Sequence, residues 1–157
     1  MSEGKADLQY FRSKRLFSWH GKDFPLYEFM GINGVSFTRV EDGLVEFRLP
    51  ISKNHLNVHK TVHGGVLALL ADLGCVWAIR GNMALDRLDR LFTYTQNLRI
   101  DYLSNVGTGN LIVVGKVVSR RRTYCLSEAD IRDEEGRLLT RAVGQIYMGE
   151  RRIESQR

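Results

Sequence analysis

The longest apolar run in the chain extends from Val66 to Ile79, and Asp72 is its only residue that is neither apolar nor small. The run is longer than most strands and rich in leucine and alanine, which favour helices. It is too short to span a bilayer, and a carboxylate lies in its middle. Because a helix that is apolar on every side must be enclosed by other structure, the pattern predicts a central helix wrapped by the rest of the chain, with one acid inside.

Alternating apolar and polar residues predict strands on both sides of this helix. Before it, positions 35–40 and 45–49 flank a hairpin-type turn at Glu41-Asp42-Gly43, and Pro50 closes the second strand. After it, turns at 104–107, 120–122 and 133–136 separate four further predicted strands, at 92–103, 111–119, 123–132 and 138–148.

The remaining segments before and after the long helix are shorter or more polar. Pro25 sets the first turn of a short predicted helix that ends before Gly31. Residues 51–62 and 81–90 are interpreted as connections into and out of the central helix. A short helix, two strands, a long helix and four strands predict an α+β fold, in which an antiparallel sheet curls around the long central helix.

The composition predicts one soluble globular domain, because 43% of the 157 residues are hydrophobic and 26% are charged. We expect an N-terminal arm at residues 1–22, a single domain at 23–149 and a charged tail at 150–157. The arm is polar and basic, which is typical of a loosely docked segment. A nucleic-acid-binding arm is the alternative, although no DNA- or RNA-binding motif follows it.

Charge and cysteine content restrict the partners and the compartment. The net charge of +5 favours an anionic partner but does not choose between nucleic acid, a membrane surface and a phosphorylated cofactor. Cys75 lies in the apolar run, so we interpret Cys75 and Cys125 as free thiols of a reducing compartment. The N-terminal residues contain no apolar stretch typical of a secretory signal. We therefore expect a cytoplasmic protein without a membrane span, although the sequence also permits targeting to an organelle.

The start of the central helix combines features suited to binding a polarised carbonyl group. His63-Gly64-Gly65 lies where the helix begins, and glycine allows close approach to the backbone. The first N–H groups of a helix lack internal partners and carry partial positive charge, so they can stabilise an oxyanion. Asp72 lies about 12 Å further along the helix, too far to act on the same carbonyl. Two antiparallel copies could each supply one group, which predicts a dimer with two shared sites.

These residues resemble a known family, the hotdog-fold thioesterases. The pattern Asn57-x5-His63-Gly64-Gly65-x6-Asp72 and the order of elements are most similar to the phenylacetyl-CoA (PaaI-like) subgroup of the 4-hydroxybenzoyl-CoA thioesterase superfamily, over roughly residues 24–148. The resemblance implies a hotdog fold and an acyl-CoA thioesterase that hydrolyses an acyl- or aryl-CoA thioester to the acid and free CoA. It also implies a homodimer or homotetramer, no metal, and no cofactor beyond the CoA of the substrate.

The resemblance also implies roles for individual residues. Asp72 would be the general base, or the nucleophile, and the Gly64 N–H would polarise the thioester carbonyl. His63 and Asn57 would orient the carbonyl side and the loop, and Asn57 is a further candidate for holding the water or the leaving sulfur. Thr95 would position the water beside Asp72. Without these roles, Gly64 would serve close packing, His63 would be a structural contact and Thr95 an ordinary strand residue.

Further residues are candidates for binding the substrate. Gly65 lies beside Gly64, and Tyr102 would line the groove for the pantetheine arm. The basic bend of Arg120, Arg121 and Arg122 would contact the CoA phosphates, because guanidinium suits phosphate, or would be a solvated turn. Trp77, Met83 and Phe92 are candidates for either the acyl pocket or the core, and we expect Trp77 in the core. No metal is expected at His55, His59 and His63, which lie in a loop without a thiolate or acidic partner.

Three alternatives to hydrolysis remain at this stage. One is a non-catalytic acyl-CoA-binding hotdog protein, and the second is a hotdog hydratase or dehydratase, which usually carries a differently spaced Asp/His pair. The third is nucleic-acid binding driven by charge, although we expect no nucleic-acid partner. The acyl group, dimer against tetramer, and CoA against acyl carrier protein are left open.

Overall fold

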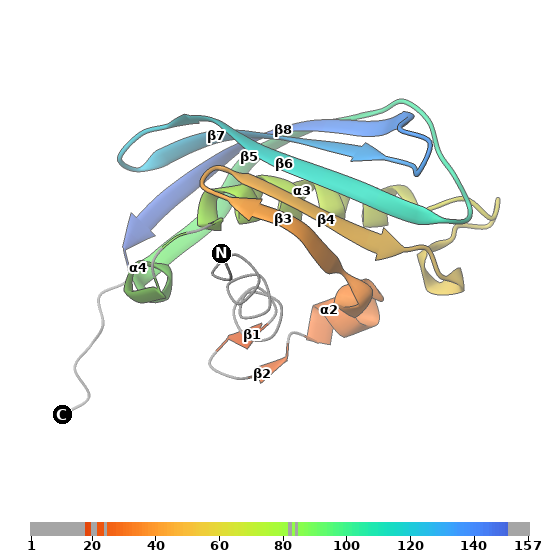
Figure 1. The fold of residues 1–157 in the computed structure, drawn as a ribbon, viewed down its shortest axis with the longest axis horizontal. Helices are drawn as coiled ribbons and strands as arrows, with labels where there is room; N and C mark the ends of the chain where they lie inside the picture. Colours follow the sequence, from red (N-terminus) through yellow and green to blue (C-terminus); the bar gives the residue numbers. More distant parts are fainter. Residues whose placement is uncertain (1–17, 20–21, 24, 82, 84, 151–157) are drawn as a thin grey trace, which may run out of the picture.

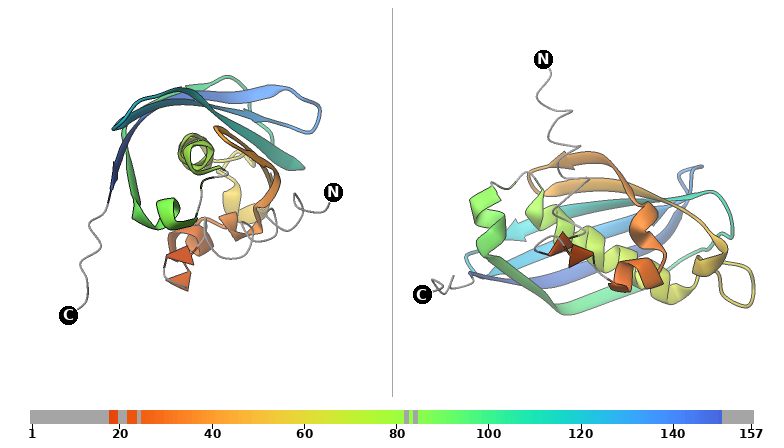
Figure 2. Two further views of the ribbon diagram at one scale, coloured as in Figure 1. Left: turned by 60° about the vertical axis from the view of Figure 1, so that its left-hand side comes forward. Right: turned by 90° about the horizontal axis from the view of Figure 1, so that it is seen from below.

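The computed structural model describes residues 18–19, 22–23, 25–81, 83 and 85–150. Six strands form one antiparallel sheet that curves around a long helix, as Figures 1 and 2 show. The strand order is β3 (Ser36–Glu41), β4 (Leu44–Pro50), β6 (Asn110–Arg120), β7 (Tyr124–Arg132), β8 (Leu138–Glu150) and β5 (Leu91–Tyr102). The predicted α+β hotdog arrangement is confirmed.

The long helix, α3 (Gly64–Arg80), lies in the concave side of the sheet, where the left view of Figure 2 shows it end-on. It begins directly after His63, as predicted, and most of its apolar residues are buried. The expected enclosure on every side needs a correction. Asp72, Val76 and Arg80 are only partly buried. Their four-residue spacing places them on one stripe that the described chain leaves partly open, so the acid is accessible rather than sealed inside.

Small residues bring α3 close to the sheet. A Cβ atom on Gly74 would lie 3.0 Å from Ala129 Cβ and 3.1 Å from Val113 Cγ1, on β7 and β6. Gly115 of β6 lies directly against the Gly74 backbone. On another side of the helix, Trp77 is 2% exposed and its ring packs against aromatic rings of the first hairpin, Phe37 and Phe47. Trp77 is therefore a core residue, as expected.

Several elements differ from the sequence-based expectation. The predicted connection at 81–90 contains a short helix, α4 (Leu85–Arg90), whose leucines recur at a helical spacing that its charged residues obscured. The last strand, β8, runs to Glu150 rather than ending at position 148. The predicted short helix is confirmed as α2 (Pro25–Phe29). Additional small elements are β1 (Ser18–Trp19), β2 (Lys22–Asp23), η1 (Ile32–Gly34) and η2 (Lys53–His55).

The predicted arm at 1–22 lies mostly outside the described residues, as do residues 151–157 of the predicted tail. Within the part of the chain that the structure covers, no helix has both the length and the apolar character that a membrane span requires.

Candidate active site

The N-terminus of α3 presents a single backbone donor. His63 caps the helix: its Nδ1 accepts a hydrogen bond from the Gly65 N–H at 2.9 Å. The His63 carbonyl accepts from Val66 at 2.9 Å and from Leu67 at 3.2 Å. The Gly64 N–H has no acceptor among the described residues, so it is available as a donor, and its carbonyl-binding role stays a prediction. The Gly65 N–H is occupied by the cap, and His63 orients the start of the helix.

The surroundings of Gly64 are open. A hollow of about 430 Å³ lies beside it, bounded on the β5 side by Tyr102 and Leu103. The Tyr102 hydroxyl donates to the Gly64 carbonyl at 3.2 Å, which places the predicted groove residue at the helix start. A Cβ atom on Gly64 would meet only the Tyr102 ring, at the ordinary distances of 3.7 and 3.9 Å. Packing within the described chain therefore does not require glycine here, in contrast to Gly74.

Asn57 stabilises the loop that leads into the helix. Its Nδ2 donates to Thr61 Oγ1 at 3.0 Å, and its Oδ1 accepts from the backbone N–H groups of His59 at 2.9 Å and Thr61 at 3.2 Å. These bonds support the loop-orienting part of its predicted role. The contact of Asn57 with water or with the leaving sulfur stays a prediction.

Asp72 and Thr95 form the shortest polar contact of the open stripe. The Thr95 hydroxyl donates to Asp72 Oδ1 at 2.6 Å, joining the middle of α3 to β5. Both residues are partly buried, and β5 has a bulge immediately after Thr95. The structure thus brings together two predicted catalytic residues that lie far apart in the chain. It does not bring Gly64 to Asp72, because eight residues of α3, about 12 Å along the helix, separate them.

Two further polar residues, Arg80 at the end of the open stripe and Tyr27 of α2, were missed from the sequence. Arg80 Nη2 donates to Thr93 Oγ1 at 2.9 Å, so α3 contacts two threonines on the same face of β5. Tyr27 of α2 lies near both charges: burial raises the pKa of its hydroxyl, while Arg80 lowers it and Asp72 raises it. The alternation of threonines along β5 is the sequence signal for this face, but without the fold it does not indicate which helix residues would meet it.

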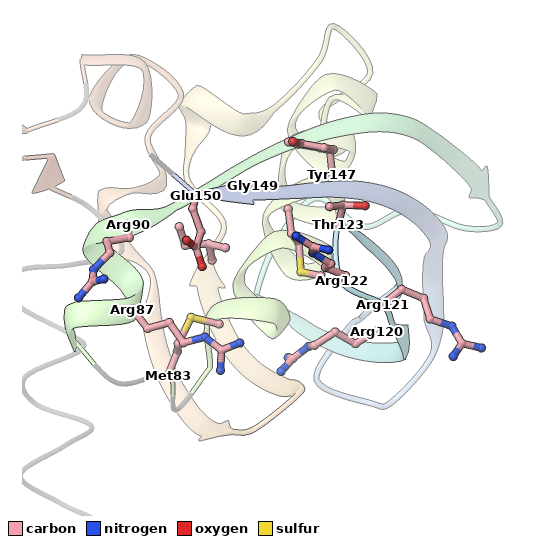
Figure 3. Close-up of a pocket in the computed structure, with 12 residues that line it drawn as sticks. Met83, Arg87, Arg90, Arg120, Arg121, Arg122, Thr123, Tyr147, Gly149 and Glu150 are labelled. Carbon is pink, nitrogen blue, oxygen red and sulfur yellow. The ribbon is translucent and has the colours of Figure 1, made fainter. Parts of the chain in front are cut away.

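A basic pocket of about 650 Å³ lies between α4 and the bend that joins β6 to β7. The predicted arginines of the bend line it, together with Arg87 and Arg90 of α4. Figure 3 shows Arg87 and Arg120 pointing toward each other across the pocket, while Arg121 points away. Arg120 is held at the end of α3, where it donates to the Ile79 carbonyl at 3.3 Å and to Asp42 at 3.2 Å. The α4 arginines were missed because 81–90 was interpreted as a connection.

The other candidate residues lie in separate places. Met83 lines the basic pocket, and Phe92 is 41% exposed on β5, where its ring lies 5.7 Å from that of Tyr94. His55 is buried, with its nitrogens bonded to the Ser52 N–H and the Gly31 carbonyl at 3.0 Å each. Among the described residues, no group of three or more His, Cys, Asp or Glu side chains is placed to hold a metal ion.

Comparisons with known proteins agree with this fold. A protein of Saccharolobus solfataricus named as an esterase is 23% identical over 132 residues, 83% of this chain and 88% of its own length. The structure of a hypothetical thioesterase of Streptococcus pneumoniae with coenzyme A superposes with a TM-score of 0.66, at 24% identity over 75% of this chain and 90% of that one. A conserved protein of Pseudomonas aeruginosa superposes with a TM-score of 0.69, at 25% identity over 80% and 94% of the two chains. The model of the thioesterase superfamily matches residues 59–140, more than half of the chain, so the protein belongs to the thioesterase superfamily and is a thioester hydrolase.

Proposed function

We propose that the protein hydrolyses acyl-CoA thioesters to the carboxylic acid and free CoA, at a site shared by two copies of the chain. The observation that carries the proposal is the bond of 2.6 Å between Thr95 and Asp72 on the partly open stripe of α3. A carboxylate held by one oxygen in a partly buried position is oriented to accept a proton from water with the other. Among the described residues no donor contacts that second oxygen, Oδ2.

The reaction follows from these groups. Asp72 takes a proton from water as its oxygen attacks the thioester carbon. The carbonyl oxygen gains negative charge, which the Gly64 N–H at the helix N-terminus stabilises. The tetrahedral intermediate then loses the C–S bond, and the leaving thiolate takes the proton from Asp72. The products are the acid and CoA with its thiol restored, and no metal or additional cofactor takes part.

A second copy is needed because Gly64 and Asp72 of one chain cannot meet. The edge strand β5 offers a surface for it, since among the described strands β5 pairs with β8 alone and its other side is unpaired. Tyr94, Tyr102 and Leu103 are between 47% and 58% exposed along or just after this strand. An unpaired edge with exposed apolar side chains is suited to pairing with another chain. Antiparallel pairing of two β5 strands would carry Asp72 of each copy toward Gly64 of the other.

The basic pocket lies within reach of this site for a CoA substrate. Arg120 contacts the helix at Ile79, which is about 10 Å along α3 from Asp72. The pantetheine arm from sulfur to phosphorus has about thirteen bonds, comparable to four extended residues or roughly 15 Å. A thioester at Asp72 can therefore place its phosphates at the bend, beside Arg120. The similar Streptococcus pneumoniae protein was solved with coenzyme A.

The subgroup, the bounds of the catalytic unit, the location and the oligomeric state belong to the same proposal. We place the protein in the PaaI-like subgroup on the pattern from Asn57 through His63 and Gly64 to Asp72. We expect one catalytic unit at 23–149, a cytoplasmic location, and a homodimer or a homotetramer built from two such dimers. A monomeric mass by light scattering at micromolar concentration would contradict the shared site.

The first test is the release of free CoA from a panel of aryl- and fatty-acyl-CoAs by the parent, by Asp72→Asn and by Asp101→Asn. Asp101 is an acid on the same strand as Thr95 but away from the helix stripe, so its variant controls for the lost charge. Asp72→Asn should lose about 10²- to 10⁴-fold in kcat and still bind CoA. Equal kcat in parent and Asp72→Asn would remove Asp72 from the mechanism.

The same panel separates the alternatives. CoA binding without release from any thioester would favour a non-catalytic acyl-CoA-binding protein. Addition of water to an enoyl-CoA without thiol release would favour a hydratase.

A further inference from the structure

The far end of the open stripe carries a positive charge that the proposed hydrolysis does not use. Arg80 lies about two helical turns beyond Asp72, and its Nη2 donates to Thr93 Oγ1 of β5 at 2.9 Å. The Nε atom of the same side chain is buried. The proposed route of the pantetheine arm ends instead at the bend between β6 and β7, and β8 separates β7 from β5 in the sheet. The guanidinium is therefore held on the β5 side of α3, away from the bend.

The spacing of two threonines sets the distance between this charge and the proposed general base. Thr93 and Thr95 are two residues apart on β5, so their side chains share one face and lie about 7 Å apart. Thr95 holds the Asp72 carboxylate, and Thr93 holds the Arg80 guanidinium. The two charged groups are therefore separated by about 7 Å along the strand. Val76 is partly buried and lies between them on the stripe, so the gap has an apolar floor.

Tyr27 borders the same gap from α2, which lies on the side of α3 that faces away from the sheet, as Figure 2 shows. Its ring meets that of Trp77 edge-on, with centroids 6.5 Å apart. Burial raises the pKa of the Tyr27 hydroxyl, and the charges of Arg80 and Asp72 both act on it. The hydroxyl therefore stays protonated at neutral pH and is a second donor near the guanidinium.

We infer that the enzyme acts on acyl groups of about four to six carbons that end in a carboxylate, and that Arg80 binds this carboxylate as a specificity-determining residue. The inference rests on the proposed acyl-CoA hydrolysis and names the acyl group. An extended chain advances about 1.2 Å per bond, so such an acyl group places its two end carbons about 4–6 Å apart. That length spans the gap when the thioester carbon lies beside Asp72. A malonyl group is too short, because its carboxylate would lie next to that of Asp72 and be repelled.

The kinetic test compares adipyl-CoA with hexanoyl-CoA, which have equal chain lengths and differ only in the terminal carboxylate. For the parent, kcat/KM should be about 10- to 100-fold higher with adipyl-CoA, because the carboxylate gains a hydrogen bond to a charged group. Arg80→Met should bring the ratio of the two kcat/KM values close to one, while Arg80→Lys keeps the charge and should retain part of it. Thr93→Val removes only the anchor of the guanidinium and should lower the ratio less. Arg99→Met is the matched control, since Arg99 is an exposed arginine of β5 that pairs with Asp101, and it should leave the ratio unchanged.

Binding of two thioethers that cannot be hydrolysed, S-(5-carboxypentyl)-CoA and S-hexyl-CoA, provides a readout without turnover. By titration calorimetry, the parent should bind the carboxylated thioether at least about tenfold more tightly, and Arg80→Met should not distinguish the two. Equal affinities in the parent, or a kcat/KM ratio that is the same in the parent and in Arg80→Met, would overturn the inference while hydrolysis itself stands. Selective binding of the carboxylated thioether, with no CoA released from any thioester, would support the acyl selectivity and overturn the proposed function.

Discussion

Gly64 and Gly74 lie on the same helix, yet the same substitution should affect them in opposite ways. In Gly74→Ala, the new methyl group would lie 3.0 Å from Ala129 Cβ and 3.1 Å from Val113 Cγ1. Neither atom can move without its strand, so overpacking should cost about 3 kcal/mol. The better helix propensity of alanine recovers about 1 kcal/mol. The net loss of about 2 kcal/mol predicts a melting temperature lower by about 4–8 °C for a chain of this size.

In Gly64→Ala, the methyl group enters open space, with the Tyr102 ring at 3.7 Å. The free energy of unfolding should stay the same or rise by about 0.5 kcal/mol, since alanine favours the first turn of the helix. Activity should fall, because the methyl group occupies the approach to the Gly64 N–H. Loss of one oxyanion donor costs about 10²- to 10³-fold in kcat, and a partial block should cost at least about tenfold.

Both variants are to be measured by thermal unfolding and by thiol release from the best acyl-CoA, well below the melting temperature. The oligomeric mass of each is checked by light scattering, so that a lost interface is not mistaken for a lost donor. Full activity in Gly64→Ala would refute the role of this glycine in catalysis. A melting temperature that drops in Gly64→Ala but not in Gly74→Ala would refute the packing argument for both positions.

Three further predictions concern the bond between Thr95 and Asp72, a buried thiol and a strained turn. Thr95→Val removes the hydrogen bond of 2.6 Å to Asp72, which is worth about 1.5–3 kcal/mol, so kcat/KM should fall about 10- to 100-fold. Thr95→Ser keeps the hydroxyl and should keep the parent kcat/KM. Equal kcat/KM in all three proteins would mean that other contacts position Asp72. Burial raises the pKa of the Cys75 thiol to about 12, so the thiol stays neutral when folded but ionises near pH 9 when unfolded. Urea unfolding should therefore show stability that is complete below pH 9 and falls by about 2 kcal/mol at pH 10.5, and a Cys75→Ala variant with the same loss would contradict this. Gly31 has φ +67°, and a Cβ atom there would lie 2.8 Å from His55 Nε2, whereas Gly136 has φ +83° and no atom within 4 Å. Gly31→Ala should therefore lower the free energy of unfolding by about 1 kcal/mol more than Gly136→Ala does. Equal losses in the two variants would show that the histidine contact is unimportant.

Sequence reasoning placed the elements well because their signals are local. The apolar run that became α3, the hairpin turn at Glu41-Asp42-Gly43 and the alternating strands each depend on the periodicity of neighbouring residues. It failed at α4, where leucines at helical spacing are few and charged residues outnumber them. It also overstated the burial of Asp72, since an apolar neighbourhood in the chain does not show which side of a helix the sheet covers.

The distance between Gly64 and Asp72 was determined by the sequence alone, because the rise of a helix per residue is constant. The proposal of a site shared by two copies follows from that distance without any coordinates, given that both groups act on one carbonyl. By contrast, only the tertiary structure decided which side chains meet across the fold. It brings Asp72 to Thr95, directs Arg87 toward Arg120 and stacks Tyr94 on Tyr147. Each depends on strand order and register, and a shift of one residue turns every side chain of a strand to the opposite face. Hydrophobic periodicity specifies which face of an element is buried, but the partners across that face are chosen by the packing of the whole sheet.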